Sequence, residues 1–312
     1  MQRREVVSLM AAGAAGFGFS STAASPSQPG SERRARKGAQ GQFVEARDGT
    51  RLYWKRWGDG RPMLFLHSWS LTSQMWDLQT AAFARLGFAC YAFDCRGHGR
   101  SDQPPEGYDY DTFADDIASV VEALDLDHLT VVCHSMACGQ IARYLSRHGS
   151  ARVDRVVMLG TTTPLLLRTD DNPSGIPAAV FEGLRAGWRK DFPKWVMDNA
   201  PPFFSPETSQ AMIQWGTNMM FQCSLPVAIA CNEAVTATDF RGDLAKITVP
   251  TLVIHGDRDA SAPLALTGEP TAGLIRGCRF KIYKGAPHGL CFTHVEQVNA
   301  DILQFIRDTT AA

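Results

Sequence analysis

The sequence predicts an α/β fold: a mostly parallel sheet with helices on both faces and a helical cap insertion. Short apolar runs such as residues 63–66 are typical of strands buried on both faces. Segments with apolar positions three or four residues apart separate these runs, as in a parallel sheet covered by helices. From about residue 164 to residue 245 this alternation stops, and proline, tryptophan, phenylalanine and methionine become frequent. We expect this stretch to form a helical cap over the carboxyl edge of the sheet.

The expected elements follow one another in a regular order. Strands are expected at 43–47, 52–56, 63–66, 88–93, 153–159, 251–255 and 280–283, with a further strand that begins at Leu129. Three apolar stripes indicate helices: Trp76, Leu78, Ala82, Phe83 and Leu86; Phe113, Ile117, Val120, Val121 and Leu124; and Val295, Val298, Ile302, Phe305 and Ile306. The second of these helices should begin at Thr112, with Asp115 as its capping partner.

Composition excludes several classes of function. A net charge of −1 over 312 residues gives no sign of a nucleic-acid partner. The basic run 33–37 lies in a Ser/Pro/Gly/Gln-rich segment and is typical of a solvated linker. Eight scattered cysteines without a CxxC pair do not form the disulfide framework of a small secreted domain. We expect reduced, packed thiols, with one disulfide formed after export as the alternative.

The first residues have the pattern of an export signal. Arg3 and Arg4 give a positive start, residues 6–19 are apolar but too short to span a bilayer, and residues 22–24 are small enough for cleavage. The paired arginines are similar to a twin-arginine signal. We therefore predict an exported, periplasmic or secreted protein without stable membrane insertion. The alternative is a cytoplasmic protein whose N-terminal helix stays attached.

These observations divide the chain into three parts. Residues 1–40 are predicted to be the export signal and a flexible linker. Residues 41–163 and 246–312 should build the α/β core, and residues 164–245 the helical cap.

The centre of the predicted site is Ser135, where a β-branched run meets a helix-forming segment. A sharp turn between strand and helix holds a serine in a strained conformation, with its hydroxyl clear of the sheet. The helix N-terminus then directs N–H groups at whatever the serine attacks. Such turns usually have glycine two residues before and two residues after the serine, and here Cys133 and Ala137 stand there. The alternative is a buried strand-to-helix turn with an idle serine.

A serine nucleophile needs a base, and the base needs an orienting carboxylate. His288 follows the last expected strand in a Gly/Pro-containing loop, and Asp259 follows the strand that ends at His255. The order Ser, Asp, His along the chain and the position after strand ends suit a site at the carboxyl edge of the sheet. Asp257 competes with Asp259 for the role of the acid.

Two backbone N–H groups could bind the negative oxygen that forms when the serine attacks a carbonyl. Met136 directly follows the serine, and Trp69 lies in the loop after the strand at 63–66. One such donor typically contributes about 3–4 kcal/mol to the transition state. No cluster of histidine and carboxylate has the spacing of metal ligands, and no glycine-rich loop is suited to a phosphate, so we expect neither metal nor cofactor.

Several segments together resemble one known family. They are residues 67–69, 94–101, 134–136, 142–144, 252–257 and 285–289. Over about residues 42–307 the chain is similar to the α/β-hydrolase branch of bacterial arylesterases, perhydrolases and cofactor-free non-haem haloperoxidases. The resemblance implies that Ser135 is the nucleophile, His288 the base and Asp259 the orienting acid, with oxyanion donors at Trp69 and Met136. It also implies that His67 and His134 are structural, and the position of His98 between two glycines indicates a structural loop residue.

The resemblance leaves the reaction partly open. Ser70 stands where perhydrolase-type members often have proline, which places ester or lactone hydrolysis ahead of peracid or haloperoxidase side activity. Carbon–carbon bond hydrolysis uses the same three residues, and a non-catalytic ligand-binding module would retain them. Dehalogenases and epoxide hydrolases are disfavoured because they have aspartate where Ser135 stands.

The cap should supply the substrate pocket. Pockets of such folds are mostly apolar, and the candidate lining residues are Trp188, Trp195, Phe203, Trp215 and Met219. We therefore expect a small-molecule ester or lactone with an apolar part as the partner. The sequence leaves open whether the protein forms a homo-oligomer.

Overall fold

The computed structural model describes residues 39–40 and 42–310. The predicted export signal lies outside the described residues, and so does all of the predicted linker except Ala39 and Gln40. These two residues form a short strand, β1 (Ala39–Gln40), which pairs with the following strand. The last two residues of the segment predicted to be a linker are therefore part of a strand.

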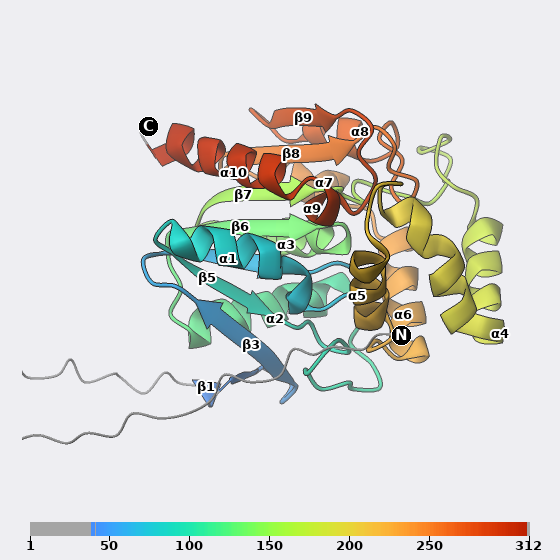
Figure 1. The fold of residues 1–312 in the computed structure, drawn as a ribbon, viewed down its shortest axis with the longest axis horizontal. Coiled ribbons are helices and arrows are strands. Elements are labelled where there is room, and N and C mark those ends of the chain that lie inside the picture. Colours follow the sequence, from blue (N-terminus) through green and yellow to red (C-terminus); the bar gives the residue numbers. More distant parts are fainter. Residues whose placement is uncertain (1–38, 41, 311–312) are drawn as a thin grey trace, which may run out of the picture. The chain divides into compact units, whose positions relative to one another are not determined.

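A mostly parallel sheet forms the centre of the described chain, as the sequence predicts (Figure 1). Within the described residues the sheet has nine strands, in the order β1-β2-β3-β5-β4-β6-β7-β8-β9. The remaining strands are β2 (Phe43–Glu45), β3 (Arg51–Trp57), β4 (Arg61–Leu66), β5 (Phe88–Phe93), β6 (Leu129–His134), β7 (Val153–Leu159), β8 (Thr251–Gly256) and β9 (Arg279–Tyr283). The pairs β1–β2, β2–β3 and β3–β5 are antiparallel, and all other neighbours in the order are parallel.

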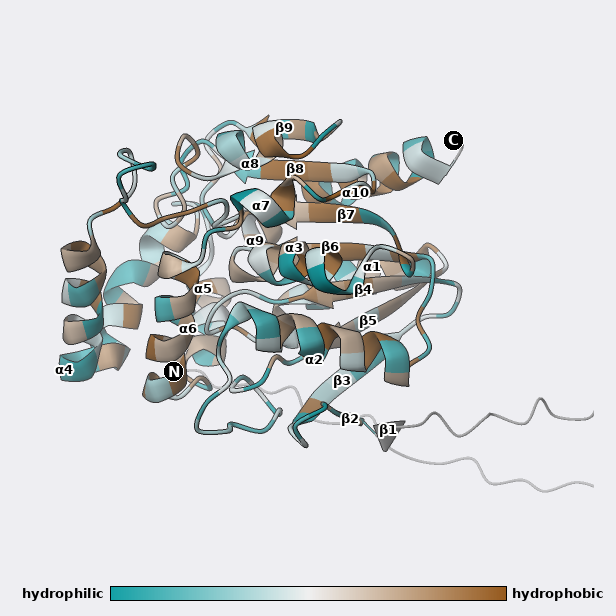
Figure 2. Cartoon of the chain, turned by 180° about the vertical axis from the view of Figure 1, so that it is seen from behind, coloured by the Kyte–Doolittle hydropathy of each residue, from teal (hydrophilic) through white to brown (hydrophobic). Residues whose placement is uncertain are grey.

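The central strands are buried on both faces. Every residue of β5, β6 and β8 is buried, which explains their continuous apolar runs (Figure 2). β4 pairs with β5 on one side and β6 on the other, and Leu66 lies opposite Cys133. This register brings the loop after β4 next to the turn after β6.

Helices cover both faces of the sheet. α1 (Asp77–Arg85) and α10 (Val295–Thr310) pack together on one face, and α2 (Tyr110–Ala123) and α3 (Met136–His148) on the other (Figures 1 and 2). Shorter helical pieces are the 3-10 turn η1 (Ser73–Trp76), α7 (Arg241–Leu244), α8 (Gly268–Leu274) and α9 (Leu290–Thr293). The predicted fold class is therefore confirmed.

Two local predictions about these helices are wrong. α2 begins at Tyr110, because the Asp109 side chain accepts from the Thr112 N–H at 2.9 Å and caps the helix. Asp115 instead pairs with Arg147 and His148 of α3. Leu86 lies just past the end of α1 and is exposed, so it does not extend the apolar stripe of that helix.

The inserted stretch forms three main helices, α4 (Ala178–Phe203), α5 (Gln210–Met220) and α6 (Leu225–Ala237). They lie at the end of the sheet toward which β6, β7 and β8 run (Figure 1). α4 is kinked at Asp191, whose side chain accepts from the Lys194 N–H at 2.9 Å and caps the second half of the helix. Residues 164–177 contain no helix, so the stretch is helical only from residue 178. No helix in the described part of the chain is long and apolar enough to cross a bilayer.

Candidate active site

Ser135 occupies the turn between β6 and α3 in a strained conformation. Its φ is 57° and its ψ is −118°, values that a residue with a side chain rarely adopts. Its backbone N–H donates to the Leu159 carbonyl of β7 at 3.0 Å. The turn therefore holds the serine rigidly at the carboxyl end of the sheet.

His288 lies within hydrogen-bond distance of both Ser135 and Asp259. His288 Nε2 is 2.9 Å from Ser135 Oγ, and His288 Nδ1 is 2.6 Å from Asp259 Oδ2. Because a carboxylate only accepts, Nδ1 carries the hydrogen and Nε2 is free to accept the serine proton. The three residues follow β6, β8 and β9, as expected for a site at this edge.

The structure separates the two candidate carboxylates. Asp257 is exposed and accepts from the Gly285 N–H at 2.6 Å, so it closes a surface turn. Asp259 is buried, and its Oδ1 accepts from the N–H groups of Ser261 and Ala262 at 3.0 and 2.7 Å. Burial alone would raise the pKa of Asp259, but the facing imidazoles of His288 and His255 lower it well below its usual range. Asp259 is therefore a charged carboxylate at neutral pH.

Three other histidines near the site have structural hydrogen bonds. Burial, together with the neighbouring imidazoles, lowers the pKa values of His98 and His134 to about 3, and burial also lowers that of His67. His134 Nε2 donates to the carbonyl of His288 at 2.8 Å. His67 Nε2 accepts from the Cys95 N–H at 2.8 Å. All three are neutral at pH 7 and hold backbone in place.

The two predicted oxyanion donors have free N–H groups. The Met136 N–H is the first of α3 and has no partner within the helix. In the described part of the chain, neither this group nor the Trp69 N–H donates a hydrogen bond. The next residue, Ser70, has a positive φ of 55°, and its N–H donates to His98 Nε2 at 3.2 Å. That bond fixes the backbone directly after Trp69.

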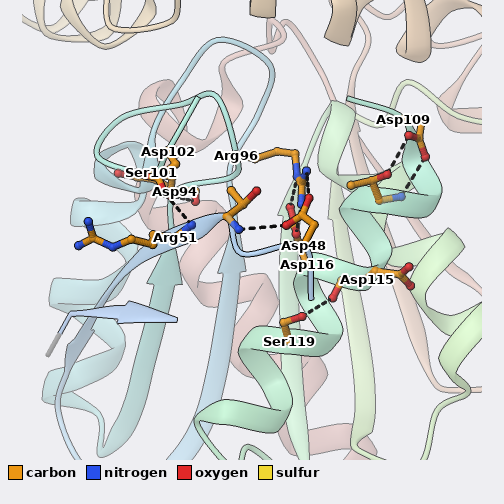
Figure 3. A network of polar contacts seen from close by, with 12 residues as sticks. Asp48, Arg51, Asp94, Arg96, Ser101, Asp102, Asp109, Asp115, Asp116 and Ser119 are labelled. Atoms are coloured by element: carbon orange, nitrogen blue, oxygen red, sulfur yellow. Dashed lines mark hydrogen bonds and ion pairs between the residues drawn. The ribbon is translucent and has the colours of Figure 1, made fainter. Parts of the chain in front are cut away.

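The loop 94–101, which contains His98, is itself held by charged groups (Figure 3). Arg96 is buried and donates to the two oxygens of Asp116 at 2.7 and 2.6 Å, and to Asp48 at 2.8 Å. The hydrogen bond from Arg96 lowers the pKa of Asp48 to about 2. Asp94 accepts from the Ser73 and Arg100 N–H groups at 2.7 and 2.9 Å. The loop is thus a rigid support for the segment that contains Trp69.

The two residues that replace glycine around Ser135 are fully buried. Cys133 directs its thiol toward the Val157 carbonyl at 3.4 Å and toward the Cys138 sulfur at 3.5 Å, so the two thiols are not bonded. Burial raises the pKa of the Cys133 thiol well above its usual range. The Cys133 side chain therefore packs between β6, β7 and α3.

Aromatic side chains of the cap surround the site. The Trp188 ring stacks on Trp69 with centroids 5.0 Å apart, and Trp195 meets Trp69 edge-on at 6.0 Å. Phe203 meets His288 edge-on at 5.6 Å. Of the other two predicted pocket residues, Trp215 packs on Phe292 with ring centroids 5.7 Å apart, and Met219 is buried in the core.

The site is nearly closed. Ser135 is 5% and His288 4% exposed. A cavity of about 490 Å³ opens between the end of α4 and the start of α5, lined by residues that include Met197, Phe204 and Ile213. Its wall residue Phe204 packs on Phe203 at 5.0 Å, and Phe203 in turn packs on His288, so these two aromatic rings connect the cavity wall to the site.

Gly160, at the end of β7, is a site residue that sequence reasoning missed. Its φ is 51°, and a Cβ atom there would lie 3.3 Å from His288 Nδ1 and 3.5 Å from Asp259 Oδ2. A side chain at this position would therefore press on the His288 ring, which would have to shift by a few tenths of an ångström. A glycine directly after a buried strand at this edge is the sequence signal that could have pointed to it.

We expect Gly160→Ala to lower kcat/KM about tenfold to a hundredfold, because small displacements of catalytic groups are costly. Gly149→Ala is the matched control, since Gly149 has a φ of 76° but open space around it. Both variants should lose about 1–3 kcal/mol of stability, because a residue with a side chain rarely adopts a backbone with positive φ. Ester turnover measures the loss of kcat/KM, and urea unfolding measures the loss of stability. A wild-type kcat/KM in Gly160→Ala would refute the prediction that a side chain there disturbs His288.

Among residues 39–40 and 42–310, no group of three or more His, Cys, Asp or Glu side chains is placed to hold a metal ion. A strained serine, an imidazole within reach of its hydroxyl and a buried carboxylate suit nucleophilic attack on a carbonyl.

A mostly parallel sheet with a serine turn after one strand and aspartate and histidine after later strands defines an α/β hydrolase. The family model described as alpha/beta hydrolase fold matches residues 61–212. The chain is 40% identical over 270 residues to a non-heme haloperoxidase from Rhodococcus erythropolis, covering 85% of this chain and 98% of that one. It is 36% identical over 273 residues to a bifunctional esterase/perhydrolase from Acinetobacter calcoaceticus, covering 85% and 99%. An esterase structure from Exiguobacterium antarcticum superposes with a TM-score of 0.83 at 30% identity, covering 86% and 100%.

The chain therefore belongs to the α/β-hydrolase branch of esterases, perhydrolases and non-heme haloperoxidases, and it is an enzyme of the hydrolase class. The resemblance predicted from the sequence is confirmed.

Proposed function

We propose that the protein is a serine hydrolase that cleaves a carboxylic ester or lactone through an acyl-enzyme intermediate. The main support is a chain of hydrogen bonds. It runs from Asp259 Oδ2 to His288 Nδ1 at 2.6 Å, and from His288 Nε2 to the Oγ of the strained Ser135 at 2.9 Å. The relatives named as esterases support the same class of reaction.

In the first half-reaction, Ser135 Oγ attacks the carbonyl carbon while His288 Nε2 takes its proton. Asp259 faces the resulting imidazolium and stabilises its charge. The negative oxygen of the tetrahedral intermediate binds the free N–H groups of Trp69 and Met136. His288 then gives the proton to the leaving alkoxide, so an alcohol departs and the acyl group stays on Ser135. For a lactone, the alcohol remains tethered to the acyl group.

In the second half-reaction, water attacks the acyl carbon and His288 accepts a proton from it. The second tetrahedral intermediate collapses, the proton passes to Ser135 Oγ, and a carboxylic acid leaves. Hydrogen peroxide in place of water would release a peracid by the same steps. We rank this perhydrolase reaction, and the related haloperoxidase activity, below hydrolysis because Ser70 stands where perhydrolase-type members often have proline.

The substrate we propose has an apolar part. Trp188, Trp195 and Phe203 lie against Trp69 and His288, and they offer apolar surface and few polar groups. Because the fold does not distinguish ester cleavage from cleavage of a diketone carbon–carbon bond, the latter is the competing hydrolytic reaction.

A substrate panel tests this proposal. Aryl and alkyl esters of short acids, a γ-lactone, a δ-lactone and a 1,3-diketone are incubated with the purified protein between pH 5 and pH 9. We expect turnover of esters or lactones, with a rate that falls on the acid side because general-base catalysis needs a neutral His288. A folded protein that turns over none of the esters and lactones, or only the diketone, would refute the proposal.

A further inference from the structure

His255 is a second imidazole on the acid of the site. It is fully buried near the end of β8, and its Nε2 lies 2.8 Å from the Ala262 carbonyl oxygen and 3.2 Å from Asp259 Oδ2. Carbonyl and carboxylate oxygens only accept here, so the ring must carry a hydrogen on Nε2. That N–H donates to the Ala262 carbonyl, and Asp259 Oδ2 lies beside it as a second, longer contact.

The other ring nitrogen favours the tautomer that carries its hydrogen on Nε2 alone. In the described part of the chain, His255 Nδ1 is buried and has no hydrogen-bond partner. A hydrogen on Nδ1 would be a buried donor without an acceptor, at considerable cost in free energy. The backbone of Gly268 fixes the ring, since a Cβ atom there would lie 2.6 Å from His255 Nδ1.

Asp259 is therefore surrounded by N–H groups. Oδ1 accepts from the backbone of Ser261 and Ala262, and Oδ2 faces His288 Nδ1 at 2.6 Å and His255 Nε2 at 3.2 Å. Every donor on a carboxylate spreads its negative charge and leaves less of it for any other partner. The His255 N–H thus shares the oxygen that would otherwise serve His288 alone.

We propose that His255 is a positioning residue that limits the charge Asp259 presents to His288, and so sets the pH at which the enzyme loses activity in acid. The inference rests on the proposed function, because it assumes that His288 is the general base. It concerns a residue that touches neither Ser135 nor the substrate side of His288.

The surroundings allow this effect to be measured. The titratable side chains that face the Asp259–His288 pair are His134 on β6 and His255 on β8. His134 is neutral and donates to the His288 carbonyl, and the cap helix α4 supplies Phe203, which does not titrate. In the described residues, Asp259 forms ion pairs with no lysine or arginine. The pH at which the rate falls on the acid side should therefore reflect the interactions among Asp259, His288 and His255.

The test compares His255→Asn with His255→Gln in ester turnover from pH 4 to pH 9. The asparagine amide ends at the level of Nδ1 and does not reach Asp259, whereas the glutamine amide reaches the position of Nε2. With the donor removed, Asp259 should favour protonated His288 more strongly. We expect His255→Asn to move the acid limb of kcat/KM up by about one pH unit, a tenfold change in proton affinity. His255→Gln should move it back toward the wild-type position.

A purely structural role would give a different result. If His255→Asn lowers the rate equally at all pH values and leaves the acid limb in place, His255 only braces the turn at residues 259–262 and the inference is wrong. If the variants do not fold, nitrogen-15 NMR of the wild-type protein decides the question. The Nε2 resonance of His255 should shift with the midpoint of the rate profile, and a resonance that stays constant would overturn the inference.

The two proposals can fail separately. A wild-type protein without an acid limb, or without ester and lactone turnover, refutes the proposed function. A normal wild-type profile that His255→Asn leaves in place refutes only the role of His255.

Discussion

Replacing Ser135 by alanine should abolish covalent labelling by a fluorophosphonate and lower kcat on esters by about 10⁴-fold or more. The probe forms a bond only with a serine oxygen that has an adjacent base and an oxyanion site. Ser135 is placed in this way, with His288 Nε2 2.9 Å away and the Met136 N–H free at the start of α3. Alanine leaves the fold intact and removes the attacking atom.

The matched control is Ser119→Ala. Ser119 is also buried, but its hydroxyl only donates to the Asp115 carbonyl within α2. Labelling and turnover should persist in this variant. Mass spectrometry of the labelled peptide identifies the modified residue. Labelling that survives in Ser135→Ala would show that another group is the nucleophile.

Asp259→Asn should lower kcat by about 10³–10⁴-fold with little change in KM, as expected when the orienting carboxylate of such a site becomes an amide. Asparagine retains an oxygen for the N–H groups of Ser261 and Ala262 and then turns its NH₂ toward His288 Nδ1. Two donors cannot bond to each other, so the imidazole must place its hydrogen on Nε2, where it no longer accepts the serine proton.

Asp257→Asn serves as the comparison because both aspartates follow β8. Asp257 is exposed and accepts from Gly285, a bond that the asparagine oxygen can keep. Steady-state kinetics should therefore differ from wild type by less than about threefold, the size expected for a surface change. If Asp257→Asn lost most of its activity while Asp259→Asn kept wild-type kinetics, Asp257 would be the acid of the site instead.

Local sequence patterns predict much of the fold, because strands and helices depend mainly on residues that are close together in the chain. Continuous apolar runs such as residues 88–93 predict strands buried on both faces, and the same residues form β5. The stripe from Phe113 to Leu124 predicts the buried face of α2, whose members are all buried. The start of α2 could not be chosen in this way, since Asp109 and Thr112 are both good capping residues and only the observed bond between them decides.

The candidate site was predictable for a related reason. In a parallel sheet, residues that follow strand ends meet at one edge, so Ser135, Asp259 and His288 could be named from their positions along the chain. The choice between Asp257 and Asp259 rested on resemblance, and the structure adds burial and a distance of 2.6 Å to His288 for Asp259 alone.

By itself, the sequence determined which segments become strands and helices and which side chains meet at the carboxyl edge, because periodicity and strand direction are encoded locally. Only the tertiary structure decided the contacts between distant segments. It brings Gly160 and His255 against the Asp259–His288 pair, directs the Cys133 thiol into the core, and closes the site with Phe203. These contacts depend on how the strands, loops and cap pack together. The spacing of residues within one segment does not predict that packing.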